Sequence, residues 1–240
     1  IDRDHSTMMI NPDDAKAIAF ALLMKKKRED VTIEMVTMGP PSITHLAEDI
    51  LRVGVDTATI ITDPLFAGSD TYVTSKILTR YLSQTSYDVI LTGTHAIDGD
   101  TSHVPPQIAQ LLDLDHLILI KHIDEESFFT SVCSVEVEDE NSITTYEIGM
   151  PCVLSLTRDA SYRLPYVRYK HLDMDVSDRI TFINHEELGL LPHEVGLKGS
   201  FTKVVTTYTK TYPLKEKIVV EPDEKGINTV YEFLQRNTFI

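Results

Sequence analysis

The chain is poor in the residues that mark several common classes of protein. It has no tryptophan and only two cysteines among 240 residues, and its 22 basic residues are outnumbered by 37 acidic ones. A formal net charge of -15 argues against a nucleic-acid binder, which needs a basic face. Cys133 and Cys152 show no CxxC spacing, so neither a zinc site nor a redox dithiol is expected.

Long apolar runs and targeting signals are also missing. No stretch is apolar for long enough to span a membrane, and nothing at the start resembles a secretory signal. We therefore expect a cytoplasmic protein with no direct membrane insertion. A hydrophobic fraction of 42% is enough to build a substantial core.

Two familiar phosphate-binding motifs are absent, but a different candidate stands in the middle of the chain. Gly93–Gln107 is rich in glycine, aspartate, threonine and serine, yet it has neither the Gly-Lys-Ser/Thr of a P-loop nor a GxGxxG pattern. It follows an apolar run at 88–92 and precedes a helical spacing at 107–112. Backbone N–H groups at a helix start can bind an anion, which makes this stretch a candidate phosphate loop. A well-capped strand-to-helix turn is the alternative.

The first half of the chain alternates between strand and helix patterns. Such alternation predicts an α/β protein with a mostly parallel sheet and helices on both faces. In these sheets, ligands bind at the carboxyl ends of the strands, where the candidate loop lies. The predicted strands are 31–37, 57–62, 88–92 and 117–120, and the predicted helices are 15–27, 42–52, 73–82 and 107–112.

The pattern changes after residue 121. Two alternating runs, 128–138 and 143–148, flank a turn at 139–142 and predict an antiparallel hairpin, followed by a strand at 152–156 that returns into the sheet. From 191 to 222 little periodicity demands a packed helix, and a short helix is predicted at 228–236. We expect a domain at 1–190 and an extended C-terminal arm at 191–240, a form that suits wrapping a partner.

Six motifs occur in an order that resembles the β subunit of electron transfer flavoproteins. The strongest match is Ala96–Thr101 with Val104 and Pro106-Gln107, and the resemblance covers nearly the whole chain. The other matching stretches are Asn11–Asp14, Thr37–Pro41, Phe66–Thr71, Pro151–Ser155 and Gly199–Val204.

The resemblance implies a Rossmann-like, adenine-nucleotide-binding domain that forms a heterodimer with a larger, FAD-bearing α subunit. The β subunit would bind either AMP or a second FAD, and electrons would come from an acyl-CoA or other flavin dehydrogenase, or from NADH. The Asp98–Thr101 and Phe66–Thr71 segments favour the second-FAD, electron-bifurcating type. Two other hypotheses are a non-redox adenine-nucleotide-binding regulatory or scaffold subunit, and an ATP-using enzyme. The absence of a lysine-bearing phosphate motif counts against the enzyme.

The resemblance also implies site residues, carried over position by position. Residues 11–14 and Met38 would border adenine and ribose, residues 98–104 would hold phosphate, and residues 69–71 are a weaker addition. Residues 164–167 are expected to form an exposed apolar tip, and Leu164 and Pro165 match the loop through which the family docks its dehydrogenases. The expected cofactor contacts are Asn11, Pro12, Asp13, Asp14, Met38, Ser69, Asp70, Thr71, Ala96, Ile97, Asp98, Gly99, Asp100, Thr101, Ser102, His103, Val104, Pro105, Pro106 and Gln107.

Several positions depart from the family pattern or allow more than one interpretation. His95 replaces the usual glutamine, and Pro105 removes a backbone donor that could meet a phosphate. Asp98 and Asp100 form a possible metal or acid–base pair, but loop-shaping through Asx turns is favoured. His95 and His103 could tune a flavin or contact phosphate, or be structural. Family members begin with a strand and a Val-Pro-Asp turn, which we expect to precede Ile1.

Overall fold

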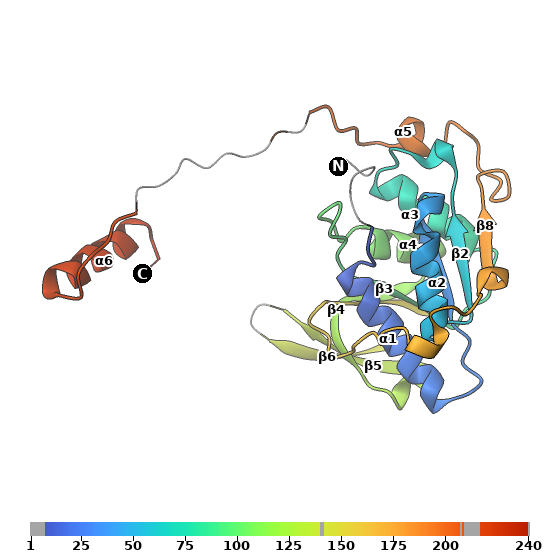
Figure 1. The fold of residues 1–240 in the computed structure, drawn as a ribbon, viewed down its shortest axis with the longest axis horizontal. Coiled ribbons are helices and arrows are strands. Elements are labelled where there is room, and N and C mark those ends of the chain that lie inside the picture. The colour runs from blue at the N-terminus through green and yellow to red at the C-terminus, as the bar shows by residue number, and fades with distance from the viewer. Residues whose placement is uncertain (1–7, 140–141, 207, 209–216, 240) are drawn as a thin grey trace. The chain divides into compact units, whose positions relative to one another are not determined.

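The computed structural model describes two compact units, Ile1–Lys203 and Val204–Ile240. The first unit extends past the boundary predicted at 190, because Val195 is buried in a core cluster with Val73 and Ile77, and Ser200 bonds to the backbone of Gly68. The described residues are 8–139, 142–206, 208 and 217–239 (Figure 1). Residues 140–141 of the predicted turn, and residues 207, 209–216 and 240 of the predicted arm, lie outside them.

A three-stranded parallel sheet forms one half of the α/β unit. Its strand order is β1 (Glu34–Met38), β2 (Thr57–Ile61) and β8 (Ile180–Ile183). Strands β1 and β2 match the predicted strands to within a few residues. β8 was not predicted, because its four residues are half exposed at a sheet edge and carry too little pattern.

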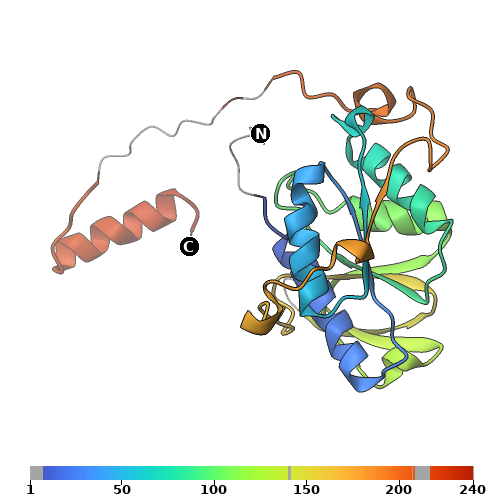
Figure 2. The same ribbon diagram turned by 45° about the vertical axis from the view of Figure 1, so that its right-hand side comes forward.

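Helices cover both faces of this sheet, as predicted for a parallel sheet. Figure 2 shows the sheet between α2 (Thr44–Val53) and α3 (Thr71–Leu82). Ile60 packs with α2 in one core cluster, whereas the next residue, Ile61, packs with α3 in another. This alternation along β2 explains why the strand reads as a continuous apolar run.

A five-stranded mixed sheet forms the other half. Three strands are parallel, and the last two form an antiparallel hairpin on one edge. The order is β3 (Val89–Gly93), β7 (Cys152–Leu156), β4 (Asp115–Ile123), β5 (Val132–Glu138) and β6 (Ile143–Gly149). The predicted parallel strands thus divide between two hydrogen-bonded sheets, and the predicted α/β class with an antiparallel hairpin is confirmed.

The inner strand β7 separates two core layers. Cys152 and Leu154 pack with α1 (Pro12–Lys27), whereas Val153 packs with α4 (Val104–Leu112). All five residues of β7 are buried, as expected of an inner strand covered on both faces. The cysteines are free and buried, and burial raises the pKa of the Cys152 thiol to about 12, which makes it unreactive.

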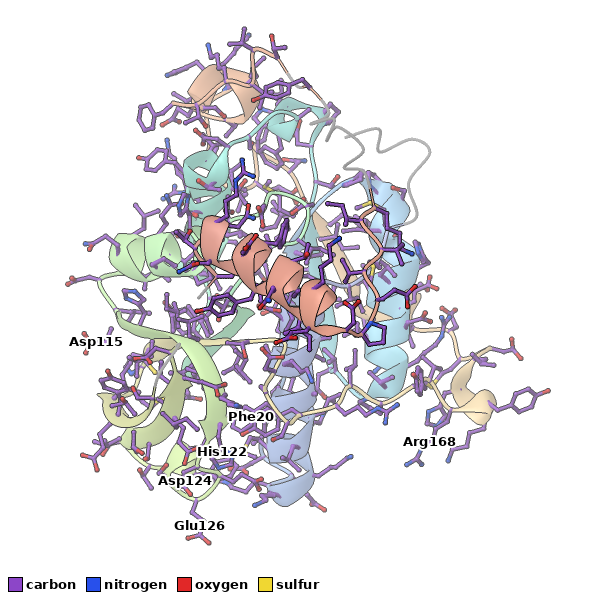
Figure 3. The ribbon with its side chains drawn as sticks, turned by 90° about the vertical axis from the view of Figure 1, so that its left-hand side faces the viewer. Phe20, Asp115, His122, Asp124, Glu126 and Arg168 are labelled. Atoms are coloured by element: carbon purple, nitrogen blue, oxygen red, sulfur yellow. The ribbon has the colours of Figure 1, made fainter. Side chains whose placement is uncertain are left out.

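Aromatic contacts join α1 to the hairpin half of the domain. The Phe20 ring lies 4.9 Å from that of Phe128 and 5.0 Å from that of Tyr162, with both pairs edge to face. The Tyr162 ring also stacks on His122 at 6.3 Å, and its hydroxyl bonds to the backbone of Ile123. Phe20 and His122 are labelled in Figure 3.

Short helices complete the chain. α5 (Gly196–Gly199) belongs to the first unit and α6 (Glu224–Arg236) to the second, where the sequence predicted a helix at 228–236. Among the residues described, no helix is both long and apolar enough to cross a membrane. Single 3-10 turns lie at Pro41–Ile43, Pro64–Phe66, Ser127–Phe129, Tyr169–His171 and Ser177–Arg179.

Candidate functional site

The start of α1 lies directly against the end of β3, so residues about eighty positions apart in sequence meet at one site. The backbone N–H of Gly93 donates to Asp14 Oδ1 at 2.6 Å, and that of His95 donates to Asp13 Oδ2 at 3.1 Å. Asn11 Nδ2 donates to the carbonyl of His95 at 2.9 Å. Asn11, Asp13 and Asp14 were predicted to share a site with the loop after β3, and the structure brings them together.

Gly93 makes this close approach possible. A Cβ at this position would lie 2.6 Å from the backbone nitrogen of Asp14 and 2.7 Å from Asp13 Cβ. Both distances are shorter than real side chains tolerate, and the main chain of α1 cannot move aside without breaking the bonds to Gly93 and His95. The glycine therefore determines how near α1 comes to the loop.

The two acids at the start of α1 are largely withdrawn from solvent. Asp13 is only 2% exposed. Burial raises the pKa of Asp14, with a smaller contribution from Asp13, and outweighs the lowering effect of the hydrogen bonds from Gly93 and Asn11. Acids favour the positive end of a helix dipole, but they also repel a phosphate from it. This end of the site thus suits hydroxyl or amino donors such as those of a nucleoside.

The loop after β3 is closed on itself by a single antiparallel bridge. The Ala96 N–H donates to the carbonyl of Thr101 at 2.9 Å, and His95 Nε2 lies 3.0 Å from Asp100 Oδ1. Asp100 has a φ of 51°, in the left-handed region, and Ile97–Asp100 form an exposed tip. His95 Nδ1 is buried and bonds to no described residue.

The closed loop leaves several backbone donors available to a ligand. The N–H groups of Asp100, Ser102 and His103 donate to no other described residue, whereas that of Thr101 faces Ala96 across the bridge, and the segment runs directly into α4. Successive unpaired N–H groups leading into a helix start are a feature of anion sites. Pro105 and Pro106 lie in the first turn of α4 and carry no N–H, so this helix start offers fewer donors than usual. The geometry suits a phosphate held mainly by Asp100, Ser102 and His103.

Arg158 is a site residue that the sequence did not single out. Its Nε lies 3.6 Å from Asp13 Oδ1, a buried oxygen that accepts no hydrogen bond from a described residue. Arg158 follows β7, which pairs in parallel with β3, so both strands end at the same edge. Its position two residues after a predicted strand suggested a place at the ligand-binding edge of the sheet. The sequence did not reveal which strand would lie beside that one.

Three of the predicted contacts have structural partners elsewhere in the domain. Gln107 Oε1 accepts a hydrogen bond from the buried Ser75 hydroxyl at 2.8 Å, between α3 and α4. Ser69 Oγ donates to the carbonyl of Phe66, and Met38 packs with the core around α3. The structure does not join these side chains to the Asn11–His95 junction.

Asp70 caps α3 and also binds a segment near residue 200. Its Oδ1 accepts from the Val73 N–H at 3.0 Å, and its Oδ2 accepts from the N–H and hydroxyl of Thr202 at 2.9 and 3.1 Å. Burial acts to raise the pKa of Asp70, but the N–H groups of Val73 and Thr202 act against it and hold the pKa below its ordinary value.

The Asp70 bonds predict a specific pH dependence of stability. A carboxyl with a lowered folded-state pKa stabilises the fold above its unfolded pKa, and this stabilisation is lost as the pH falls through the folded value. We expect Asp70→Asn to cost about 1 kcal/mol of unfolding free energy at neutral pH, and less below about pH 4. Urea unfolding across that range measures the difference. A cost that stays constant with pH would contradict the assignment.

The predicted docking loop differs from expectation at its first residue. Leu164 was expected at an exposed apolar tip with Pro165, but its side chain is partly buried and packs against two core clusters. The exposed apolar side chains are instead Tyr166 and Tyr169, at 83% and 91% exposure. Arg168, labelled in Figure 3, marks this segment. Leu164 was misplaced because the local sequence does not show that two core clusters from other parts of the chain pack against it.

Comparison with known proteins gives relatives that span most of the chain. The family described as "Electron transfer flavoprotein domain" matches residues 1–164. The chain is 31% identical over 211 residues to the caffeyl-CoA reductase-Etf complex subunit CarD of Acetobacterium woodii, covering 86% of this chain and 78% of that protein. The electron transfer flavoprotein subunit beta of Thermoanaerobacterium thermosaccharolyticum is also 31% identical, over 208 residues with the same coverage. Protein FixA of Azotobacter vinelandii is 30% identical over 238 residues, or 93% of this chain and 81% of that protein.

Fold and site together define a Rossmann-like α/β protein with a polar loop at the carboxyl ends of its parallel strands. The chain belongs to the electron transfer flavoprotein family, and it is an electron-transfer β subunit. The resemblance drawn from the sequence motifs is confirmed, and a non-redox regulatory role is not favoured.

Proposed function

We propose that this β subunit holds FAD at the loop of residues 96–107 and works as a heterodimer with a flavin-bearing α subunit. Electrons would enter from NADH or from an acyl-CoA or other flavin dehydrogenase. One observation carries the proposal. The hydrogen bonds between Asn11–Asp14 and Gly93–Ile97 bring an acidic, nucleoside-compatible surface and an anion-compatible loop to the same edge of the sheet.

The residues of this chain would bind and orient the cofactor. Phosphate would lie against the N–H groups of Asp100, Ser102 and His103, since the carboxylates of Asp13 and Asp14 disfavour an anion at the start of α1. Ribose hydroxyls and the adenine amino group can donate to the side-chain oxygens of Asn11 and Asp14, whereas Asp13 is almost fully buried. Bound FAD would supply the hydride and one-electron chemistry.

AMP is the second candidate ligand, and one observation favours it. Pro105 and Pro106 remove two backbone donors from the start of α4, where a second phosphate would otherwise find them. A monophosphate needs fewer donors than a pyrophosphate. An AMP-binding subunit would be structural and would not split the electrons of NADH.

We assign partner binding to two further surfaces. The arm at 191–240 would wrap the α subunit, because α6 carries apolar residues at 227, 230, 231 and 234, a one-sided helical spacing that is largely exposed. The segment that contains Leu164, Pro165 and Tyr166 would dock a dehydrogenase. Pro165 and Tyr166 present the exposed surface, and Leu164 anchors the segment to the core.

The test is the nucleotide content of the complex with its α subunit. The co-expressed complex is denatured, and the released nucleotides are separated and counted by chromatography. We expect two FAD per heterodimer, followed by NADH oxidation in the intact complex. One FAD with one AMP would establish the structural ligand and refute bifurcation. Release of only one nucleotide per heterodimer would show that the loop binds neither.

A further inference from the structure

We infer that residues 196–202 and residues 65–70 form a clasp that sets where the C-terminal arm leaves the α/β unit, with Ser200 and Thr202 as positioning residues for assembly. The inference rests on the proposed role of the arm in binding the α subunit. It also gives Asp70 a role in assembly, where the family resemblance suggested a cofactor contact.

Hydrogen bonds join the two sides of the clasp at three points. The Leu197 N–H donates to the carbonyl of Ala67 at 3.1 Å. Ser200 Oγ accepts from the Asp70 N–H at 2.8 Å and lies 3.1 Å from the carbonyl of Gly68, with Ser200 only 7% exposed. Thr202 donates to Asp70 Oδ2 from both its N–H and its hydroxyl. Bonds to a carboxylate are stronger than those between neutral groups.

Two glycines allow the backbones of the clasp to touch. Gly196 has a φ of 58°, and a Cβ there would lie 2.0 Å from the carbonyl oxygen of Leu65. Gly68 has a φ of 79° and faces Leu197, whose Cβ would be 3.1 Å away from an added methyl group. Both positions are ones that only glycine occupies without strain. The close approach is therefore built into both segments.

The clasp is the last attachment of the arm to the α/β unit before residue 204. Among the described residues, Thr202 is the last in chain order to hydrogen-bond to the α/β unit, and this compact unit ends at Lys203. The next apolar residues, Val204 and Val205, are 82% and 93% exposed. Holding the root of a long arm reduces the conformations that it must lose when it binds, which strengthens association.

The carboxylate of Asp70 is committed to this attachment. One of its oxygens caps α3 and the other receives both Thr202 donors. Both oxygens thus have internal donors, and the Asp70 N–H is taken by Ser200. A nucleotide bound at Asp70 would have to displace the hydrogen bonds to Ser200 and Thr202, and these bonds attach the arm to the α/β unit.

The test uses variants on the arm side of the clasp, none of which removes the cap of α3. In the full chain, Thr202→Val removes the hydroxyl donor while keeping the shape of the side chain, and Ser200→Ala removes the bridge to Asp70. We expect the double variant to raise the Kd for the α subunit about tenfold, and the single variant Thr202→Ser, which keeps the hydroxyl donor, to bind with wild-type affinity. Ser177→Ala is the matched control, because Ser177 also donates its N–H and hydroxyl to one carboxylate oxygen, that of Asp175.

The outcomes separate the clasp from the arm. A raised Kd in the double variant, with a thermal midpoint close to that of Ser177→Ala, supports the clasp. A Kd within twofold of wild type overturns it if a chain ending at Lys203 binds poorly. If that shortened chain binds as well as the full chain, the arm itself has no role in assembly, and both the clasp and that part of the proposed function fail.

Discussion

Replacing Gly93 by alanine is expected to destabilise the α/β unit by about 3 kcal/mol, the upper end of the typical cost of overpacking, because the added methyl group would meet main-chain atoms. The added methyl group would lie 2.6 Å from the backbone nitrogen of Asp14 and 2.8 Å from the carbonyl carbon of Asp13. To relieve these contacts α1 must move away from β3, which breaks the hydrogen bonds from Gly93 and His95 to the two acids. Urea unfolding followed by circular dichroism measures the loss.

The matched control for this change is Gly149→Ala. Gly149 is also the last residue of a strand, but a Cβ at that position meets no atom within 4 Å. We expect its free energy of unfolding to stay within about 0.5 kcal/mol of wild type. Equal costs for the two variants would show that alanine disfavours both strand ends alike, and that the approach of α1 to β3 is not tightly packed.

Removing residues 204–240 is expected to abolish stable association with the α subunit at micromolar concentrations. The apolar face of α6 includes Ile227, Val230 and Tyr231, which are 65%, 45% and 56% exposed. Burying side chains of this size contributes about 1.5–3 kcal/mol each, so the loss of several exceeds what a micromolar complex can withstand. Analytical ultracentrifugation of the mixed subunits measures the association.

Single substitutions on α6 distinguish its apolar face from a general effect of the arm. Val230→Asp places a charge in the apolar stripe, whereas Asn228→Asp adds the same charge off the stripe. We expect the first to weaken binding at least tenfold and the second to leave it nearly unchanged. Equal weakening by both would point to net charge instead of an apolar contact.

The parts of the fold that the sequence revealed are those with local periodicity. Helix α1, strand β2 and the hairpin of β5 and β6 lie close to their predicted positions, because each has a local sequence signal: helix-forming residues in α1, a β-branched apolar run in β2 and alternating residues in the hairpin. Local patterns of this kind do not determine the order of the strands in a sheet. The insertion of β7 between β3 and β4 depends on pairings between distant residues, and it is this insertion that brings Arg158 to Asp13.

The candidate site likewise contains some contacts that the sequence predicted and others that it did not. Contacts around Asn11–Asp14 were inferred from motif order, and the structure joins them to the loop after β3. Asp70 was grouped with them because its segment resembles a family motif, yet its bonds go to Thr202, 132 positions away. No local pattern marks so distant a partner. Leu164 was predicted to be exposed for a similar reason. The two core clusters that pack against it are built from other parts of the chain.

The most direct test of the central claim is to observe the loop while a nucleotide binds. The subunit is labelled with 15N and assembled with an unlabelled α subunit, and the nucleotide of this subunit is removed and then restored by titration with FAD or AMP. We predict that the amide signals of Asp100, Ser102 and His103 shift most, because their N–H groups would donate to the phosphate. If these signals stay in place while others shift, the nucleotide binds elsewhere and the proposed site is wrong.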